Sequence, residues 1–222
     1  MKFRRLLSAL LLAAGLVSAA GCGREEKKPE EPAKQKAPSG RGGGGLEKQY
    51  KIYHAQGFAA GEFIKALKAD GKVLVVVAHV SRRDETMRRL FSGMEKGLGA
   101  APTVDWIDVT EDDEVTADMV NAVLAKHAGV TAVAFFGALP KDFPRMNVGG
   151  AKIFLFDSDV VELSVLKKAI EDGKIAGLLM PKLNRPKSSA ALEDTDREIF
   201  DRRFVIIDPA NVAKYGGYFI PR

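Results

Sequence analysis

The chain has 222 residues, of which 46% are hydrophobic and 28% are charged, and this length suits one domain with a well-buried core. Its 34 Lys and Arg against 29 Asp and Glu give a net charge of +5, but the basic excess lies near the N-terminus, because residues 52–222 hold 23 basic and 24 acidic residues. This balance argues against a nucleic-acid-binding domain, which would carry clustered basic side chains.

The first 22 residues have the pattern of a bacterial export signal. Three basic residues precede an apolar run over residues 6–17, which has the length of a secretory h-region and is too short to span a membrane. Small residues then lead to Cys22, the only cysteine. This segment resembles the lipobox of bacterial lipoproteins, which implies a signal peptide over residues 1–21 and a lipid on Cys22. Ala19 stands where Leu or Val is commoner, so an ordinary cleaved signal is the alternative.

Residues 23–45 have no apolar periodicity, mix both charges with Pro, and end in four glycines, so they cannot bury enough surface to fold. We therefore expect residues 22–50 to form a lipidated cysteine with a disordered tether, and residues 51–222 to form a single folded domain. Gly23 follows the cysteine in place of the Asp associated with inner-membrane retention, which favours the outer membrane. The expected location is the bacterial envelope, with the domain facing the periplasm.

The folded part alternates helix and strand patterns. An amphipathic helix is expected over residues 57–69, and the apolar, β-branched run at 72–78 is typical of a strand buried on both faces. Apolar residues at three- and four-residue spacing predict a helix over 84–98. Further strands are expected at 103–109, 130–136, 152–156, 175–180 and 203–207. Further helices are expected at 116–127, with Met119, Val123 and Leu124 facing inward, and at 159–171, with Asp159 and Glu162 as an N-terminal capping pair.

This alternation predicts an α/β fold of three layers, a single Rossmann-like lobe with a mostly parallel, doubly wound sheet of five or six strands. Such sheets bind ligands beyond the carboxyl ends of their strands, where the strand order reverses. The residues after the strands suit a sugar-like solute, because Arg and Asp hydrogen-bond hydroxyl groups in pairs and Phe covers an apolar ring face. The candidate ligand-binding residues are His79, Ser81, Arg82, Phe136, Asp157, Asp159 and Asn184. Polar residues also gather at strand ends for structural reasons, and Asp159 would then only cap its helix.

Four segments carry a family resemblance: residues 73–98, 149–159, 170–181 and 205–215. They resemble the opening strand and helix, the strand ending in Asp, the late helix–Gly–strand unit and the C-terminal strand of type I periplasmic sugar-binding proteins and the related lactose-repressor group. The resemblance implies a periplasmic-binding-protein-like lobe that binds a solute for transport or sensing. Asp157 is the best-matched ligand residue, followed by Ser81 or Arg82.

The resemblance also implies partners. These are a small sugar-like solute, the membrane through the lipid anchor, and a transporter or sensor subunit, with no nucleic acid. Family members close two lobes over the ligand, whereas the length of this chain suffices for one. Either a partner or a second copy supplies the other lobe, or the fold serves as a protein-interaction scaffold in the envelope without sugar binding.

The sequence patterns that would indicate an enzyme are weaker than those that indicate a binding protein. Residues 154–161 resemble the nucleophile motif of the haloacid dehalogenase superfamily, which would imply a Mg-dependent, phosphatase-like hydrolase with Asp194 and Asp196 as the missing acids. In that superfamily the motif follows the first strand, and here it follows the fourth. No GxGxxG after the first strand, P-loop or GxSxG motif is present, and the histidines are too scattered for a zinc motif. His127 is expected to meet the dipole of a helix C-terminus. We expect a binding protein without catalytic activity, cofactor or metal.

Overall fold

Residues 43–67, 71–78, 85–109, 114–156, 161–184 and 193–219 are described by the structure, a computed structural model, and all belong to a unit that spans Gly40–Arg222. In chain order the elements are α1 (Gly43–Ala66), β1 (Lys72–Ala78), α2 (Glu85–Leu98), β2 (Thr103–Ile107), α3 (Ala117–Leu124), β3 (Val130–Phe136), η1 (Phe143–Arg145), β4 (Lys152–Leu155), α4 (Leu163–Glu171), β5 (Ile175–Pro181), α5 (Asp196–Arg203), β6 (Phe204–Ile207) and η2 (Gly216–Phe219).

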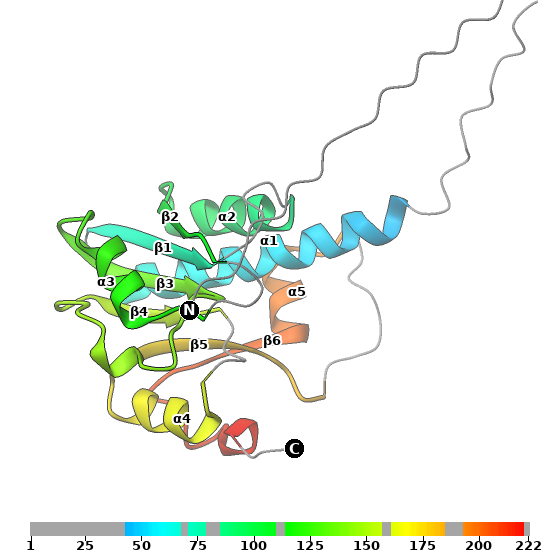
Figure 1. The fold of residues 1–222 in the computed structure, drawn as a ribbon. Helices are drawn as coiled ribbons and strands as arrows, with labels where there is room; N and C mark the ends of the chain where they lie inside the picture. Colours follow the sequence, from blue (N-terminus) through cyan, green and yellow to red (C-terminus); the bar gives the residue numbers. More distant parts are fainter. Residues whose placement is uncertain are drawn as a thin grey trace, which may run out of the picture. The chain divides into compact units, whose positions relative to one another are not determined.

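The six strands form one sheet in the order β2-β1-β3-β4-β5-β6 (Figure 1). β1 to β5 pair in parallel, and β6 runs antiparallel to β5 at the edge. Leu74, Val75, Val76 and Val77 of β1 are completely buried, as a continuous apolar run requires when helices cover both faces of a sheet. The predicted α/β fold with a mostly parallel sheet is confirmed.

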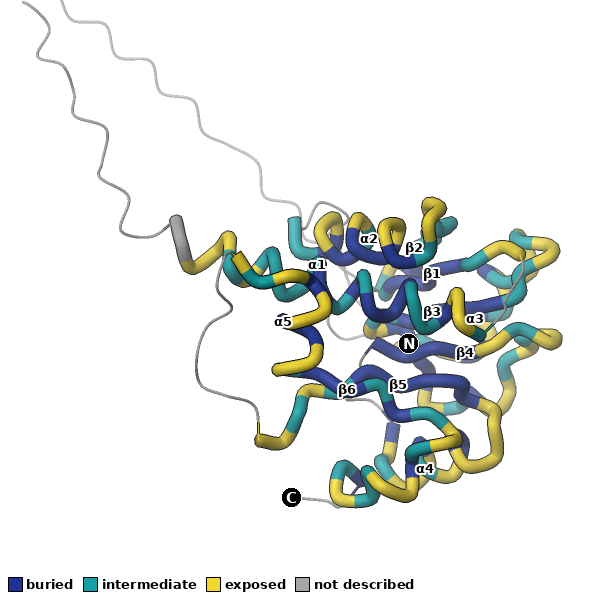
Figure 2. Tube along the Cα trace, turned by 180° about the vertical axis from the view of Figure 1, so that it is seen from behind, coloured by how far each residue is buried: buried dark blue, intermediate teal, exposed yellow. Residues whose placement is uncertain are grey.

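Helices cover both faces of the sheet and enclose two hydrophobic cores (Figure 2). Leu74 and Val76 contribute to the core under α3 and α4, whereas Val75 and Val77 contribute to the core under α1 and α2. This division follows from the strand geometry, in which successive side chains point to opposite faces. Among the described helices, none combines the length and hydrophobicity needed to cross a membrane.

α1 begins at Gly43, so the predicted helix start at residue 57 was wrong, and residues 43–50 are helical rather than part of the tether. The helix packs closely against α2 through glycines on both helices. An ideal Cβ on Gly57 would lie 1.9 Å from the Leu90 carbonyl oxygen, and one on Gly93 would lie 1.9 Å from the His54 carbonyl oxygen. The two helices therefore touch backbone to backbone, and this packing stabilises a helix that its own glycines disfavour.

Two other helices depart from the prediction, one at its N-terminus and one because it was not predicted. α4 begins at Leu163, and Glu162 takes the N-cap position without a side-chain hydrogen bond to the helix, so the predicted capping role of Glu162 was wrong. α5 was not predicted at all, although Thr195 and Glu198 form a capping box in which each side chain bonds to the other residue's backbone. Such a box is a recognisable helix-start signal in sequence.

α3 meets the core partly as predicted. Val123 is buried and Leu124 packs partly buried against the core, but Met119 is 38% exposed and the neighbouring Val120 is buried in its place. The helix spans only Ala117–Leu124, and at this length one residue of register decides which apolar side chains meet the sheet.

Candidate functional site

The carboxyl ends of β1 to β5 meet at one edge of the sheet, where the ligand was expected. The chain leaves β1 through α2 to β2 on one side, whereas it leaves β3 to β4 on the other side. The strand order therefore reverses between β1 and β3, which is where parallel sheets of this kind bind ligands, because the connections on either side turn away from each other. Gly137, directly after β3, has a φ of +60°, and its ideal Cβ would lie 3.5 Å from the Ala78 carbonyl oxygen. The exit of β3 thus runs beside the end of β1.

Two of the predicted ligand-binding residues, Phe136 and Asn184, lie in the described part of the chain. Phe136 ends β3, and its ring centroid lies 5.8 Å from that of the buried Phe156. Its side chain packs partly buried against the core under α1 and α2, so only part of its ring is available to a solute. The other candidates stay predictions because they fall outside the described residues: His79, Ser81, Arg82, Asp157, Asp159 and the lipidation residue Cys22.

Asn184 is exposed and follows β5, which is two strands away from β3. Since neighbouring strands lie about 4.8 Å apart, roughly 10 Å separates the exits of β3 and β5. Asn184 therefore follows a strand that is not adjacent to β3. The exit of β5 is tied to the C-terminal segment, because the Leu183 backbone N–H donates to the Tyr218 hydroxyl at 3.1 Å.

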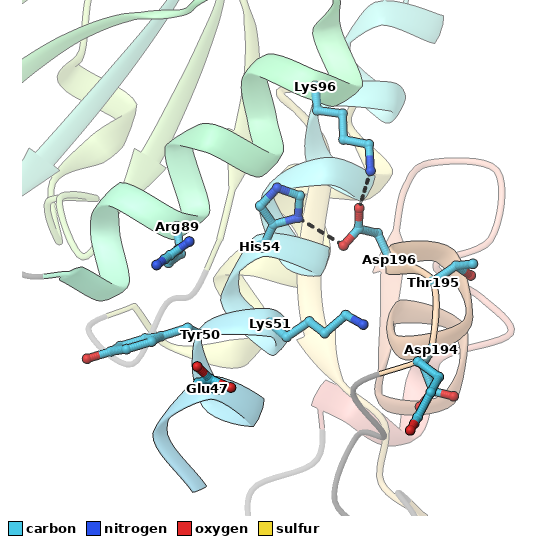
Figure 3. Close-up of a pocket in the computed structure, with 10 residues that line it drawn as sticks. Glu47, Tyr50, Lys51, His54, Arg89, Lys96, Asp194, Thr195 and Asp196 are labelled. Atoms are coloured by element: carbon cyan, nitrogen blue, oxygen red, sulfur yellow. Dashed lines mark hydrogen bonds and ion pairs between the residues drawn. The ribbon is translucent and has the colours of Figure 1, made fainter. Parts of the chain in front are cut away.

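A second candidate site is a groove of about 580 Å³ on the helical layer, here called the α1–α2–α5 groove (Figure 3). Its volume is typical of small-molecule sites. α1 lies between α2 and the start of α5 and forms the floor, while α2 and the start of α5 form the walls. The lining residues are Glu47, Tyr50, Lys51 and His54 from α1, Arg89 and Lys96 from α2, and Glu193, Asp194, Thr195 and Asp196 at the start of α5.

Asp196 joins the three helices at one end of this groove. It is 9% exposed, and its two carboxylate oxygens contact His54 Nδ1 at 2.9 Å and Lys96 Nζ at 2.7 Å. Burial by itself raises the pKa of Asp196, but the hydrogen bonds from Lys96 and His54 outweigh it and hold the pKa below its usual value. The carboxylate is therefore ionised at neutral pH, and it closes the groove at this end.

Arg89 and Tyr50 lie at the other end of the groove. The Arg89 Nε donates to the Glu85 carboxylate at 2.9 Å, and the guanidinium carbon lies 5.7 Å from the centroid of the Tyr50 ring. These two contacts orient the guanidinium against an aromatic face, which is a favourable cation–π arrangement. On the opposite wall, Asp194 pairs with Arg202.

The sequence interpretation missed this groove. Residues 47–50 were assigned to the tether, and no helix was predicted after β5. The first part of α1, which forms part of the groove floor, and α5, which forms one wall, were therefore missing from the sequence prediction. The capping box at Thr195 and the paired glycine spacing of α1 and α2 were the signals that could have revealed both helices.

The structure also bears on the weaker enzymatic hypothesis. Asp194 and Asp196 were the candidate magnesium ligands, but Asp194 pairs with an arginine and both oxygens of Asp196 accept from nitrogen donors. Across the described ranges, no group of three or more His, Cys, Asp and Glu side chains is arranged to hold a metal ion. His127, which was expected to meet a helix dipole, contacts Asp105 Oδ2 through its Nε2 at 3.0 Å.

No protein-family model and no curated protein matches the sequence. Solved structures similar to this chain include a sugar-binding protein of a sugar ABC transporter from Bacillus halodurans, at 18% identity, a TM-score of 0.47, and coverage of 74% of this chain and 64% of that one. An ABC transporter solute-binding protein from Agrobacterium vitis, bound with α-D-tagatopyranose, is 16% identical with a TM-score of 0.48, over 77% of this chain and 61% of that one. A periplasmic solute-binding protein from Actinobacillus succinogenes with bound D-allose is 10% identical with a TM-score of 0.45, over 73% and 62%. The chain thus spans less than two thirds of the length of each.

Proposed function

We propose that this protein binds a small polar solute, sugar-like in chemistry, at the carboxyl edge of its sheet, for transport or sensing at the bacterial envelope and without catalysing a reaction. The observation that carries the proposal is the reversal of strand order between β1 and β3. Parallel sheets with such a reversal have a crevice at this edge, because the connections on either side turn away from each other.

The chemistry of the strand exits supports a polar, uncharged ligand. The segments that follow β1, β4 and β5 carry Ser81, Arg82, Asp157 and Asn184 in sequence, and the partly exposed ring of Phe136 ends β3. Hydroxyl groups both donate and accept hydrogen bonds, so they can satisfy guanidinium, carboxylate and amide groups at once. An aromatic ring provides the apolar surface on which the C–H face of a sugar packs.

Calorimetric titration of the full-length protein in detergent with a panel of pentoses, hexoses and related polyols tests the proposal. We expect saturable binding of at least one compound, weakened at least tenfold by Asp157→Asn. Asp172→Asn is the matched control, because it makes the same chemical change beside the amino end of β5, at the opposite edge. Absence of binding to every compound, or equal loss in both variants, would contradict the proposal. A stoichiometric protein partner recovered from crosslinked membranes in that case would favour the interaction scaffold.

We further propose that Cys22 carries the lipid that holds the domain at the membrane. The support is the sequence pattern of a short export signal that ends at the only cysteine. Labelling of growing cells with an alkyne-bearing fatty acid should mark the protein, and Cys22→Ser should abolish the label and release the protein from the membrane fraction. Separation of inner and outer membranes by density then tests the expectation from Gly23. A Cys22→Ser protein that is still labelled would refute the anchor.

A further inference from the structure

We propose that a groove at the amino edge of the sheet, between η1 and α4, binds a monocarboxylate with a short apolar chain, such as hexanoate. Two cavities of about 330 Å³ each share Phe143, Pro144 and Lys174, and together they are here called the η1–α4 groove. One cavity lies along α4, and the other lies at the start of β4. Each volume falls within the range of small-molecule sites. The groove is separate from the solute site proposed at the carboxyl edge.

Apolar side chains line much of this groove. Phe143 and Ala169 are buried at its base, whereas Pro144 and Val165 are exposed along it. Met146 extends the apolar lining toward the start of β4. Apolar side chains gain free energy when a ligand removes them from water, so this lining favours a ligand with an apolar body.

Two cations at the groove have no ionic partner. Lys152 and Lys174 both line the cavity at the start of β4, and both are exposed. Within the described ranges, neither side chain takes part in an ion pair or a hydrogen bond. The other lysine that lines the groove, Lys168, pairs with Asp172 at 3.3 Å. The groove therefore carries two uncompensated positive charges, which favour an anion and disfavour a cation.

These two lysines lie side by side at the ends of neighbouring strands. Lys152 precedes Ile153 on β4 and Lys174 precedes Ile175 on β5, and the two isoleucines are partners in the parallel pairing of these strands. Neighbouring strands lie about 4.8 Å apart, so the two positive charges repel each other. An anion bound to both lysines replaces this repulsion with attraction.

A carboxylate at the end of an apolar chain satisfies both features of the groove. Each of its two oxygens can accept a hydrogen bond from one lysine ammonium group, while the chain covers the exposed side chains of Pro144 and Val165. The backbone beside the lysines leaves room for such a ligand. An ideal Cβ on Gly150 or Gly173, which both line the cavity, would have no neighbour within 4 Å.

A chain-length series tests the proposal. Acetate, butyrate, hexanoate and octanoate are titrated into the full-length protein in detergent and followed by calorimetry. We expect affinity to rise about three- to fourfold for each added methylene until the cavity is filled, which is the factor that burial of one CH₂ group gives. Hexanamide has the same length without the charge and should bind at least tenfold more weakly than hexanoate. The neutral amide enters micelles more readily than the carboxylate, so this preference cannot come from the detergent.

Three variants and a matched control assign the binding to the groove. Lys152→Gln and Lys174→Gln should each weaken hexanoate about fivefold, as expected for an exposed ion pair. Val165→Thr should weaken hexanoate about threefold and leave acetate unchanged, because it removes apolar contact alone. Lys167→Gln removes the same charge from α4 and should leave all affinities unchanged, because Lys167 pairs with Glu171 and does not line the groove.

Several results would overturn the proposal. Absence of saturable binding by every carboxylate would do so, and so would equal loss of hexanoate affinity in Lys167→Gln and Lys174→Gln. Equal binding of hexanamide and hexanoate would show an apolar surface without anion selectivity, of the kind that docks a protein. Sugar binding at the carboxyl edge should be the same in all four variants, so the two sites fail or succeed separately.

Discussion

Substituting Ala for Gly93 should break the contact between α1 and α2. The new Cβ would lie 1.9 Å from the His54 carbonyl oxygen, 2.8 Å from the His54 carbonyl carbon and 2.9 Å from the Phe58 backbone nitrogen, whereas ordinary contact begins at 3.4 Å. These are main-chain atoms of a helix, so they cannot rotate away as a side chain would. Relief of the closest contact requires the helices to separate by about 1.5 Å, and well-packed interfaces resist such shifts.

The magnitude follows from two opposing effects. Overpacking a well-packed interface costs about 1–3 kcal/mol or more, and a clash with backbone belongs at the upper end of that range. Ala is favoured over Gly within a helix by about 1 kcal/mol, so we expect a net loss of about 2 kcal/mol in the free energy of unfolding. For a domain of this size the melting temperature should fall by about 4–8 °C.

Urea unfolding followed by circular dichroism measures this loss. Gly45→Ala in α1 is the matched control, since an ideal Cβ there has no neighbour within 4 Å, and it should be neutral or stabilise the protein by up to about 1 kcal/mol. If Gly93→Ala were as stable as the wild type, or if both variants changed stability in the same direction and by the same amount, the close packing of α1 on α2 would be refuted.

Three further predictions concern polar groups that hold the helices and the sheet edge. Because the pKa of Asp196 lies below its ordinary value of 3.8, it stabilises the fold above that pH, and the advantage of the wild type over Asp196→Asn in urea should shrink as the pH falls below about 4. The pKa of Asp105 is also lowered, chiefly by the hydrogen bond from His127, so the stability advantage of the wild type over Asp105→Asn should likewise shrink as the pH falls below about 4. A stability difference that does not change with pH would contradict this prediction. Thr195→Ala should lower the free energy of unfolding by about 1 kcal/mol, because it removes the N-cap side chain of α5 that accepts a hydrogen bond from the Glu198 backbone. Thr195→Ser keeps a hydroxyl at the N-cap and should retain most of that stability. Thermal unfolding of both variants tests this, and a Thr195→Ser protein no more stable than Thr195→Ala would contradict the capping role.

The strands could be predicted from the sequence because each is a local pattern. The apolar run at residues 72–78 coincides with β1, and that at 130–136 coincides with β3, since a strand buried on both faces must be apolar along its whole length. The C-terminal part of α1 was predicted, but its first part, residues 43–56, was missed. Its stability comes largely from close packing on α2, where the backbone of α1 contacts Gly93, and not from a glycine-led sequence that favours a helix by itself.

The candidate ligand-binding residues likewise combine a local feature that the sequence predicts with a position that only the tertiary structure sets. Phe136 was correctly placed at the end of a strand, but its packing on Phe156 depends on a neighbouring strand. Which strand ends neighbour that of β3 follows from the order of the strands across the sheet, and that order depends on how the crossovers wind rather than on any local pattern.

The sequence by itself determined the alternation of helices and strands, and with it the α/β class and the expectation of a ligand at the carboxyl edge of a parallel sheet, because hydrophobic periodicity acts over a few residues. Only the tertiary structure decided the α1–α2–α5 groove. His54 and Lys96 lie 142 and 100 residues from Asp196 in the chain, and no local pattern relates them. Their contact exists because glycines let α1 and α2 meet at backbone distance and because α5 packs beside α1, which brings a basic wall opposite an acidic one.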